Sequence, residues 1–387
     1  MSSLERRLAV KLQMMILLVY ASNACFFAFQ PVYFSDRRLS FTQIGIAFAV
    51  GSLVSIVALP IWGYLSDRVL NKKKTLLATI LPSILLVLMF ITLDNFFGII
   101  LLVAINGLFI YGIYPIIDAY TFDVIELNQK MGFAHFRVMA SIGYGLANLA
   151  LGFAIKFLGI NVSFIAYALL SGLCLLLLLT TKFEGKKHFT KVDFKMLGQS
   201  LRSVHIVVLL ITVFLMNAAF MGGVNYMNEL IKFTGGDVSN LGMAWFITCM
   251  VEVGTFYFTN KLIRRIGVVN VYIISTFIYA IKFALDFFLK TPELILSVQV
   301  LEGIAFTLFI TSSLIYLNEN TRPEARASMM SICGAFGGFG CLTAGLFGGI
   351  LLNVVNPSQL YGIFALVCLT ATLLAFLLRR KASLTTT

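Results

Sequence analysis

Twelve long apolar segments constrain how this chain can fold more than any other feature of its sequence. A transmembrane helix needs about 20 consecutive apolar residues, and every segment approaches or exceeds that length. They lie near residues 12–34, 42–65, 75–93, 97–123, 135–158, 162–181, 204–228, 239–260, 268–289, 293–317, 328–353 and 358–378. Only 12% of the chain is charged, against about 25% in an ordinary soluble domain. The sequence therefore predicts an all-α membrane protein with twelve transmembrane helices.

The longest polar interval divides these segments six and six. We predict an N-terminal six-helix bundle over residues 1–181, a cytoplasmic linker over 182–203 and a C-terminal six-helix bundle over 204–387. Lys and Arg are enriched on the cytoplasmic loops of membrane proteins. With the N-terminus inside, 22 of the 29 basic residues fall on cytoplasmic loops and tails, and 5 fall outside. Both termini are therefore expected in the cytoplasm of a multi-pass protein of the bacterial inner (plasma) membrane.

Several other functions are disfavoured by the same sequence. The net charge of +12 follows from the loop asymmetry, so nucleic-acid binding is not expected. The six cysteines lie singly in apolar segments without CxxC spacing, as small hydrophobic residues do. The three histidines lie at segment edges without metal-ligand spacing, and no nucleophile-plus-base arrangement is evident. We therefore expect neither an enzyme nor a metal or cofactor site, and no soluble module supports a receptor.

The loop after the second segment carries an acidic residue that membrane topology does not explain. It reads GYLSDR over 63–68 and is followed by lysines 72–74. The two halves also repeat weakly, because Ser-Ile-Gly at 141–143 is echoed by Ser-Ile-Cys-Gly at 331–334. This loop and two parallel six-helix repeats resemble the major facilitator superfamily of transporters. The resemblance implies alternating access, with a conformational gating loop that includes Gly63, Asp67 and Arg68.

Ionisable side chains inside the apolar segments are the strongest indication of function. Each costs roughly 2.5–3.5 kcal/mol at a helix centre, so such residues are rare unless they are paired or line a cavity. They are Asp118 and Asp123 in the fourth segment, Arg137 in the fifth, Glu252 in the eighth, Lys282 and Asp286 in the ninth, and Glu302 in the tenth.

Asp118 and Arg137 are the candidates for solute binding in the first half. Tyr114 lies four residues before Asp118, and Tyr144 lies seven residues after Arg137, so each ring shares a helix face with its charge. An Asp and an Arg on neighbouring helices can hold each other and still offer hydrogen bonds to a polar ligand. The alternative is a purely structural ion pair. Amides that could also line the cavity are Asn23 and Asn217.

These residues resemble the lactose permease branch of the superfamily, the oligosaccharide/proton symporters, and the related nucleoside/proton symporters. The matching motifs are Pro-x-x-acid-Ala over 115–119 and an Arg followed seven residues later by an aromatic residue. In that family the carboxylate and the arginine bind the sugar, and a tryptophan stacks on its ring. The resemblance implies those roles for Asp118, Arg137 and Tyr144. Tyrosine in place of tryptophan leaves the preferred sugar open.

The second half offers candidates for proton coupling. The resemblance places Glu252 and Lys282 at the family's charged positions, and Glu302 where the family has a histidine. Ala305 replaces a family carboxylate. Burial favours a neutral carboxyl group and a nearby lysine favours an ionised one, so a site alternating between these environments can take up and release a proton. Glu302 is the first candidate for the carrier, Glu252 the second, and Lys282 the positive partner.

A structural alternative concerns the same segment. Lys282 and Asp286 are four residues apart and could neutralise each other along one helix face, which would leave Glu252 and Glu302 unexplained.

The sequence thus favours a monomeric secondary transporter in the lipid bilayer that couples symport of a small polar solute, a sugar or a nucleoside, to a proton gradient. The alternative is a proton-driven exporter of drugs or other amphipathic compounds. Such exporters often carry a Pro-Gly signature in the fifth segment, which is absent here. The candidate solute-binding residues are Asp118, Arg137, Tyr144, Tyr114, Asn23 and Asn217, and the candidate proton-coupling residues are Glu302, Glu252, Lys282 and Asp286.

Overall fold

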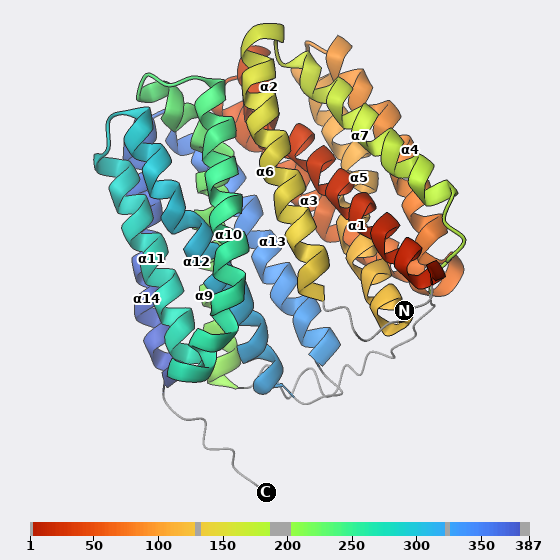
Figure 1. Cartoon of the computed structure of the whole chain (residues 1–387). Helices are drawn as coiled ribbons and strands as arrows, with labels where there is room; N and C mark the ends of the chain where they lie inside the picture. The colour runs from red at the N-terminus through yellow and green to blue at the C-terminus, as the bar shows by residue number, and fades with distance from the viewer. Residues whose placement is uncertain (1–2, 128–132, 186–202, 322–325, 380–387) are drawn as a thin grey trace, which may run out of the picture. The chain divides into compact units, whose positions relative to one another are not determined.

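Twelve helices long and apolar enough to cross a membrane make up the computed structural model, which describes residues 3–127, 133–185, 203–321 and 326–379 (Figure 1). No strand occurs within these ranges. Each predicted segment coincides with one of the twelve spans, and the ends agree to within six residues. The predicted all-α fold with twelve transmembrane helices is therefore confirmed, while the sidedness of the termini stays a prediction.

The chain divides into two compact units, Met1–Thr190 with Gly236–Met250, and Lys191–Gly235 with Val251–Thr387, which we call unit 1 and unit 2. Helix α10 (Val238–Ile266) contributes to both. The predicted division of the chain at 182–203 stays a prediction, and most of that linker lies outside the described residues.

Unit 1 contains the helices of the first six spans. They are α1 (Ser3–Asn23), α2 (Gln30–Asp36), α3 (Phe41–Tyr64), α4 (Lys72–Met89), α5 (Phe96–Leu127), α6 (Phe133–Leu158) and α7 (Asn161–Leu179). Helix α1 packs against α6 and α7, and α5 packs against α3 and α4. A short π-helical stretch at Ala24–Ala28 interrupts the first span, and another at Leu65–Val69 ends the second.

Unit 2 contains α9 (Val204–Phe233), α11 (Val268–Phe288), α12 (Pro292–Glu319), α13 (Arg326–Leu351) and α14 (Pro357–Ala375), followed by a short 3₁₀ turn at Phe376–Arg379. Helix α9 packs against α13 and α14, and α11 packs against α12 and α14. Polar caps begin several helices. Ser40 starts α3 and Asn356 starts α14, each in a reciprocal bond with a glutamine three residues later.

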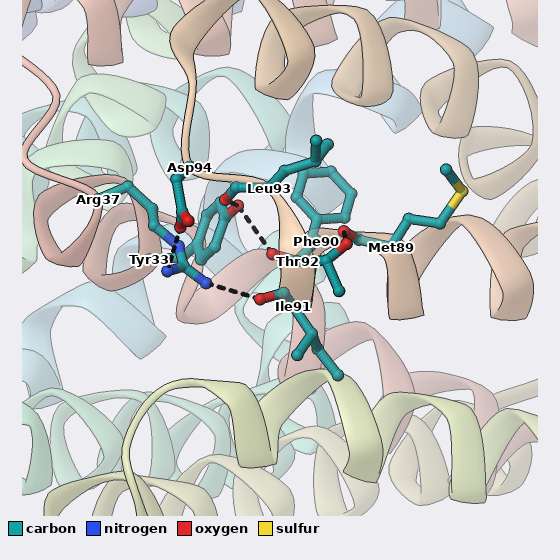
Figure 2. Close-up of polar contacts among 8 residues, drawn as sticks. All are labelled: Tyr33, Arg37, Met89, Phe90, Ile91, Thr92, Leu93 and Asp94. Carbon is teal, nitrogen blue, oxygen red and sulfur yellow. Dashed lines mark hydrogen bonds and ion pairs between the residues drawn. The ribbon is translucent and has the colours of Figure 1, made fainter.

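The end of the first span is fastened to the end of the third by the contacts in Figure 2. The Tyr33 hydroxyl is 3.0 Å from the carbonyl oxygens of both Phe90 and Leu93, to which it can donate. Arg37 donates to the Asp94 carboxylate at 2.6 Å and to the Ile91 carbonyl at 3.0 Å. These bonds satisfy carbonyl groups that the end of α4 leaves without helical partners, so they hold α2 against α4.

One glycine sets how closely α1 approaches α6. A side-chain carbon at Gly143 would lie 2.4 Å from the carbonyl oxygen of Leu17, so only glycine fits at this crossing. Leu17 lies three residues before Tyr20, and Gly143 lies six residues after Arg137. The close crossing therefore brings the side chains of α1 within reach of the charged end of α6.

Candidate solute and proton sites

Three side chains from three helices of unit 1 meet in one polar cluster. Arg137 Nη1 of α6 lies 3.8 Å from Asp118 Oδ2 of α5. Tyr20 of α1 lies between them: its hydroxyl accepts a hydrogen bond from Arg137 Nη1 at 2.6 Å and is 3.3 Å from both Asp118 oxygens. The predicted proximity of Asp118 and Arg137 is present, and the tyrosine bridges the pair.

The cluster is accessible enough to meet a ligand. The side chains of Arg137 and Asp118 are 33% and 31% exposed, whereas those of Lys72–Asp123 and Lys282–Asp286 are 3% exposed or less. The Arg137 guanidinium also lies 5.1 Å from the centre of the Tyr20 ring, within the range of a cation–π contact. Two opposite charges, one hydroxyl group and one aromatic ring therefore lie together where a polar solute could reach them.

The other predicted solute residues lie at different distances from this cluster. The Tyr114 ring lies 5.9 Å from that of Tyr20, and its buried hydroxyl has no hydrogen-bond partner among the described residues. Tyr144 is half-buried on α6, two turns from Arg137, and Asn23 is half-buried at the end of α1. Asn217 belongs to unit 2 and donates to the carbonyl of Val213 on its own helix. Their roles stay predictions.

A second charged cluster lies inside unit 2 and contains two carboxylates and one ammonium group. Lys282 Nζ is 3.0 Å from Asp286 Oδ2, one turn along α11, and 2.8 Å from Glu302 Oε2 on α12. The three side chains are 2%, 0% and 3% exposed. The ammonium also lies 4.5 Å from the ring centre of Phe283. We call Lys282, Asp286 and Glu302 the buried triad.

The triad contains both the structural ion pair and the first candidate proton carrier, which were alternatives in the sequence analysis. The neutralising Lys282–Asp286 pair along one helix is present, and Glu302 joins the same ammonium from the neighbouring helix. Glu252 lies half-buried on α10, outside the bonds that define the triad. Whether any of the four residues carries a proton stays a prediction.

The predicted gating loop is surrounded by a polar network that the sequence did not reveal. Asp67 is half-buried in the π-helical stretch after α3, Arg68 stacks on Tyr64 at 5.2 Å, and Gly63 is exposed with open space around it. The dominant contact is instead the pair Lys72–Asp123, with Nζ 3.0 Å from Oδ2 and side chains 3% and 2% exposed.

The chain after α7 joins this network. Asn71 caps α4 by accepting from the Lys74 amide at 2.8 Å, and its side chain donates to Glu184 at 2.7 Å. Lys73 Nζ donates to the Thr181 carbonyl at 2.7 Å. The first residues after α7 are therefore fastened to the start of α4 and lie close to the buried Lys72.

Tyr20 and Lys72 are the ion-pair and bridging residues of these clusters whose roles sequence reasoning missed, and the partners Asn71 and Glu184 were missed with Lys72. Tyr20 had one available signal, since it lies three residues before Asn23 and so on the same helix face. Lys72 had none, because a run of three lysines at a segment end is what a cytoplasmic loop normally contains.

Similar proteins agree with this fold. The chain is 28% identical over 338 residues to the transporter YwbF of Bacillus subtilis, covering 86% of this chain and 83% of YwbF. It is 24% identical over 371 residues to the maltose permease of Geobacillus stearothermophilus, covering 94% and 93% of the two chains. The crystal structure of a single-residue mutant of the nucleoside transporter NupG superposes with a TM-score of 0.86 at 16% identity, covering 98% of this chain and all of NupG.

Twelve helices able to cross a membrane, together with these transporter relatives, define a multi-pass transporter of the bacterial cell membrane. Such a protein carries solutes and is not an enzyme. The chain belongs to the MFS_1 like family, which matches residues 9–363. The predicted membership of the major facilitator superfamily is therefore confirmed.

Proposed function

We propose that this transporter is a proton-coupled symporter of a small neutral polar solute, either a sugar or a nucleoside. The observation that carries the proposal is the buried triad, in which two carboxylates share one ammonium group at 3.0 and 2.8 Å. No comparable excess of charge is needed to hold two helices together, since a single ion pair or a hydrogen bond would suffice.

The charge of the triad supports a proton as the coupling ion. With both carboxyl groups ionised, the three side chains carry a net charge of −1 at exposures of 3% or less. An uncompensated charge in an apolar interior is costly. One proton on Asp286 or Glu302 brings the triad to zero. When the site becomes hydrated during alternating access, that cost falls and the proton can leave, while Lys282 holds the remaining carboxylates.

The polar cluster of unit 1 supports a neutral solute. Asp118 and Arg137 together carry no net charge. A charged ligand would therefore give the occupied site a net charge, whereas a neutral polar ligand would leave it neutral. The names of two similar proteins point to the same chemistry, since one is a permease of maltose and the other a transporter of nucleosides. Both kinds of solute are neutral and carry several hydroxyl groups.

Uptake into proteoliposomes tests this function. Purified protein is reconstituted, a gradient of one pH unit (inside alkaline) is imposed, and labelled maltose and uridine are followed separately. One proton per solute at one pH unit supports accumulation of about tenfold. A protonophore should reduce the ratio to one. Accumulation that survives the protonophore would contradict proton coupling, and accumulation only with the inside acidic would indicate the exporter.

A matched pair of variants on α12 tests the triad. Glu302→Gln leaves Lys282 and Asp286 as a neutral pair, so we expect solute exchange between internal and external pools to continue while proton-driven accumulation is lost. Glu293→Gln removes an exposed carboxylate from the first turn of the same helix and should leave both activities unchanged. If Glu302→Gln accumulates solute as the wild type does, the triad is not the coupling site.

A further inference from the structure

Asp118 and Arg137 form a long ion pair in this structure rather than a short hydrogen-bonded one. Their closest distance is 3.8 Å, whereas a direct charge-assisted hydrogen bond of this kind measures about 2.7–2.9 Å. The Tyr20 hydroxyl fills the gap, 2.6 Å from the guanidinium and 3.3 Å from each carboxylate oxygen. One oxygen atom therefore accepts from the arginine and offers its proton to the aspartate.

Few chemical groups can do both at a single atom. An ammonium group only donates and a carboxylate only accepts, whereas a hydroxyl donates one hydrogen bond and accepts others. The space between Asp118 and Arg137 is thus suited to a hydroxyl group on a neutral molecule. Sugars and the ribose of nucleosides both supply such a group, and the Tyr20 hydroxyl has the same chemistry.

We propose that the Tyr20 hydroxyl holds the place of a solute hydroxyl, and that a neutral polyhydroxylated solute displaces it to bind between Asp118 and Arg137. The inference rests on the proposed function, because it assigns the binding step of that transport to these atoms. Tyr20 is then a residue that sets specificity: only a solute that can replace its hydroxyl regains both hydrogen bonds.

The geometry makes the exchange feasible. The two contacts from Tyr20 to Asp118 are long, at 3.3 Å, and long hydrogen bonds are weak. Asp118 and Arg137 are about one-third exposed, and Tyr20 is itself only half-buried. By contrast, Lys72 and Asp123 are 3% and 2% exposed, so no solute could reach that pair without unpacking the unit.

Tyr114 provides a second, independent indication of a ligand. Its hydroxyl is buried and has no hydrogen-bond partner in the described part of the chain, although buried polar atoms almost always have one. Its ring lies 5.9 Å from that of Tyr20, so it borders the same space. A polyhydroxylated solute that displaces the Tyr20 hydroxyl would bring further hydroxyl groups, one of which can satisfy Tyr114.

A thermodynamic double-mutant cycle, in which one hydroxyl is removed from the protein and one from the solute, tests the displacement. Binding to the purified full-length protein is measured by calorimetry for maltose and for uridine, and for monodeoxy derivatives of whichever binds. The wild type is compared with Tyr20→Phe. If the two hydroxyls compete for one place, Tyr20 can refill it when the solute lacks its hydroxyl, so the deletion is cheap in the wild type. In Tyr20→Phe nothing refills it, and the loss of affinity should be about three- to tenfold greater.

Two further tyrosine variants define the controls. Tyr114→Phe removes a hydroxyl that has no partner among the described residues, and it should weaken binding of the parent solute about three- to tenfold. Tyr33→Phe removes a hydroxyl that donates to backbone carbonyls in the fastening of α2 to α4 and should leave the affinity unchanged.

The outcomes separate this inference from the proposed function. If removing the solute hydroxyl lowers the affinity equally in the wild type and Tyr20→Phe, the two hydroxyls act independently. If it lowers the affinity less in Tyr20→Phe, Tyr20 forms a hydrogen bond to the bound solute. Either result overturns the displacement while leaving symport intact. If the wild type binds neither maltose nor uridine, the proposed solute class is wrong and the inference falls with it.

Discussion

Substituting Asp123 by Asn removes the carboxylate from an ion pair that is the most completely buried among the described residues of unit 1. Lys72 Nζ lies 3.0 Å from Asp123 Oδ2, and their side chains are 3% and 2% exposed. Deleting one member of a buried pair typically costs about 3–5 kcal/mol, because the other charge stays in a medium that solvates it poorly. Replacing both members by apolar residues of similar size is often neutral or stabilising.

These free-energy differences predict distinct melting temperatures for the single variant, the double variant and a control. For a unit of roughly 200 residues, 1 kcal/mol shifts the midpoint by about 2–4 °C, so Asp123→Asn should lower it by about 6–20 °C. The double variant Lys72→Met/Asp123→Leu should regain most of that loss. Asp94→Asn is the matched control, because Asp94 pairs with Arg37 at 2.6 Å but is 77% exposed. Exposed pairs contribute about 0–1 kcal/mol, or about 0–4 °C.

The assay is thermal unfolding of the purified full-length protein in detergent, followed by intrinsic fluorescence at one heating rate for all variants. The reasoning is refuted if Asp123→Asn melts within the range of Asp94→Asn. It is also refuted if the double variant melts below Asp123→Asn, because removing the remaining Lys72 charge would then not restore stability.

Three further predictions follow from single contacts. Asp118→Asn keeps the size but not the charge, so solute affinity should fall at least about tenfold; unchanged calorimetric binding would assign Asp118 a structural role. A side-chain carbon at Gly242 would lie 2.4 Å from the Asn148 carbonyl oxygen, so Gly242→Ala should force α10 from α6 and lower the melting temperature, and a wild-type value would contradict that crossing. Partial burial raises the pKa of Asp237, but hydrogen bonds from Lys156 and Ser239 have the larger combined effect and lower the pKa to about 2. Stability from this carboxylate is therefore present above about pH 4 and is lost as the pH falls toward 2, a dependence that should be absent in Asp237→Asn melting curves.

The sequence predicted the spans well because the bilayer imposes one requirement on every helix. About 20 apolar residues are needed to cross it, and no tertiary detail alters that length. The π-helical interruption of the first span could not be predicted from span length in the same way. The π-helical stretch Ala24–Ala28 is apolar, and its Cys25 carbonyl accepts a hydrogen bond from Ser163 of α7. A hydropathy pattern carries no information on a partner 138 residues away.

The candidate site was predictable where its contacts are local. Lys282 and Asp286 are four residues apart on one helix, a spacing that places side chains side by side. Asp118 and Arg137 were indicated because unpaired charges are expensive in a membrane. Tyr20 was not singled out, because a tyrosine in an apolar segment is ordinary and its spacing from Asn23 does not connect it to Asp118 or Arg137. Its role depends on how closely α1 approaches α6, which only the packing of both helices determines.

Lys72 shows a different limit of sequence reasoning. Its neighbours Lys73 and Lys74 belong to the same basic run, and topology explains all three equally well. Only the folded chain separates them, because Lys72 turns into unit 1 toward Asp123 while Lys73 donates to the carbonyl of Thr181. Charge runs at helix ends can thus contain one buried, structural member.

The coupling of solute movement to proton movement is most directly tested by driving protons with the solute. Proteoliposomes at equal internal and external pH receive maltose or uridine outside, and a pH indicator follows the lightly buffered medium. We expect transient alkalinisation as protons enter with the solute, with an initial ratio near one proton per solute, and no alkalinisation with Glu302→Gln although solute still enters. Solute entry into wild-type vesicles without any change of external pH would contradict the account.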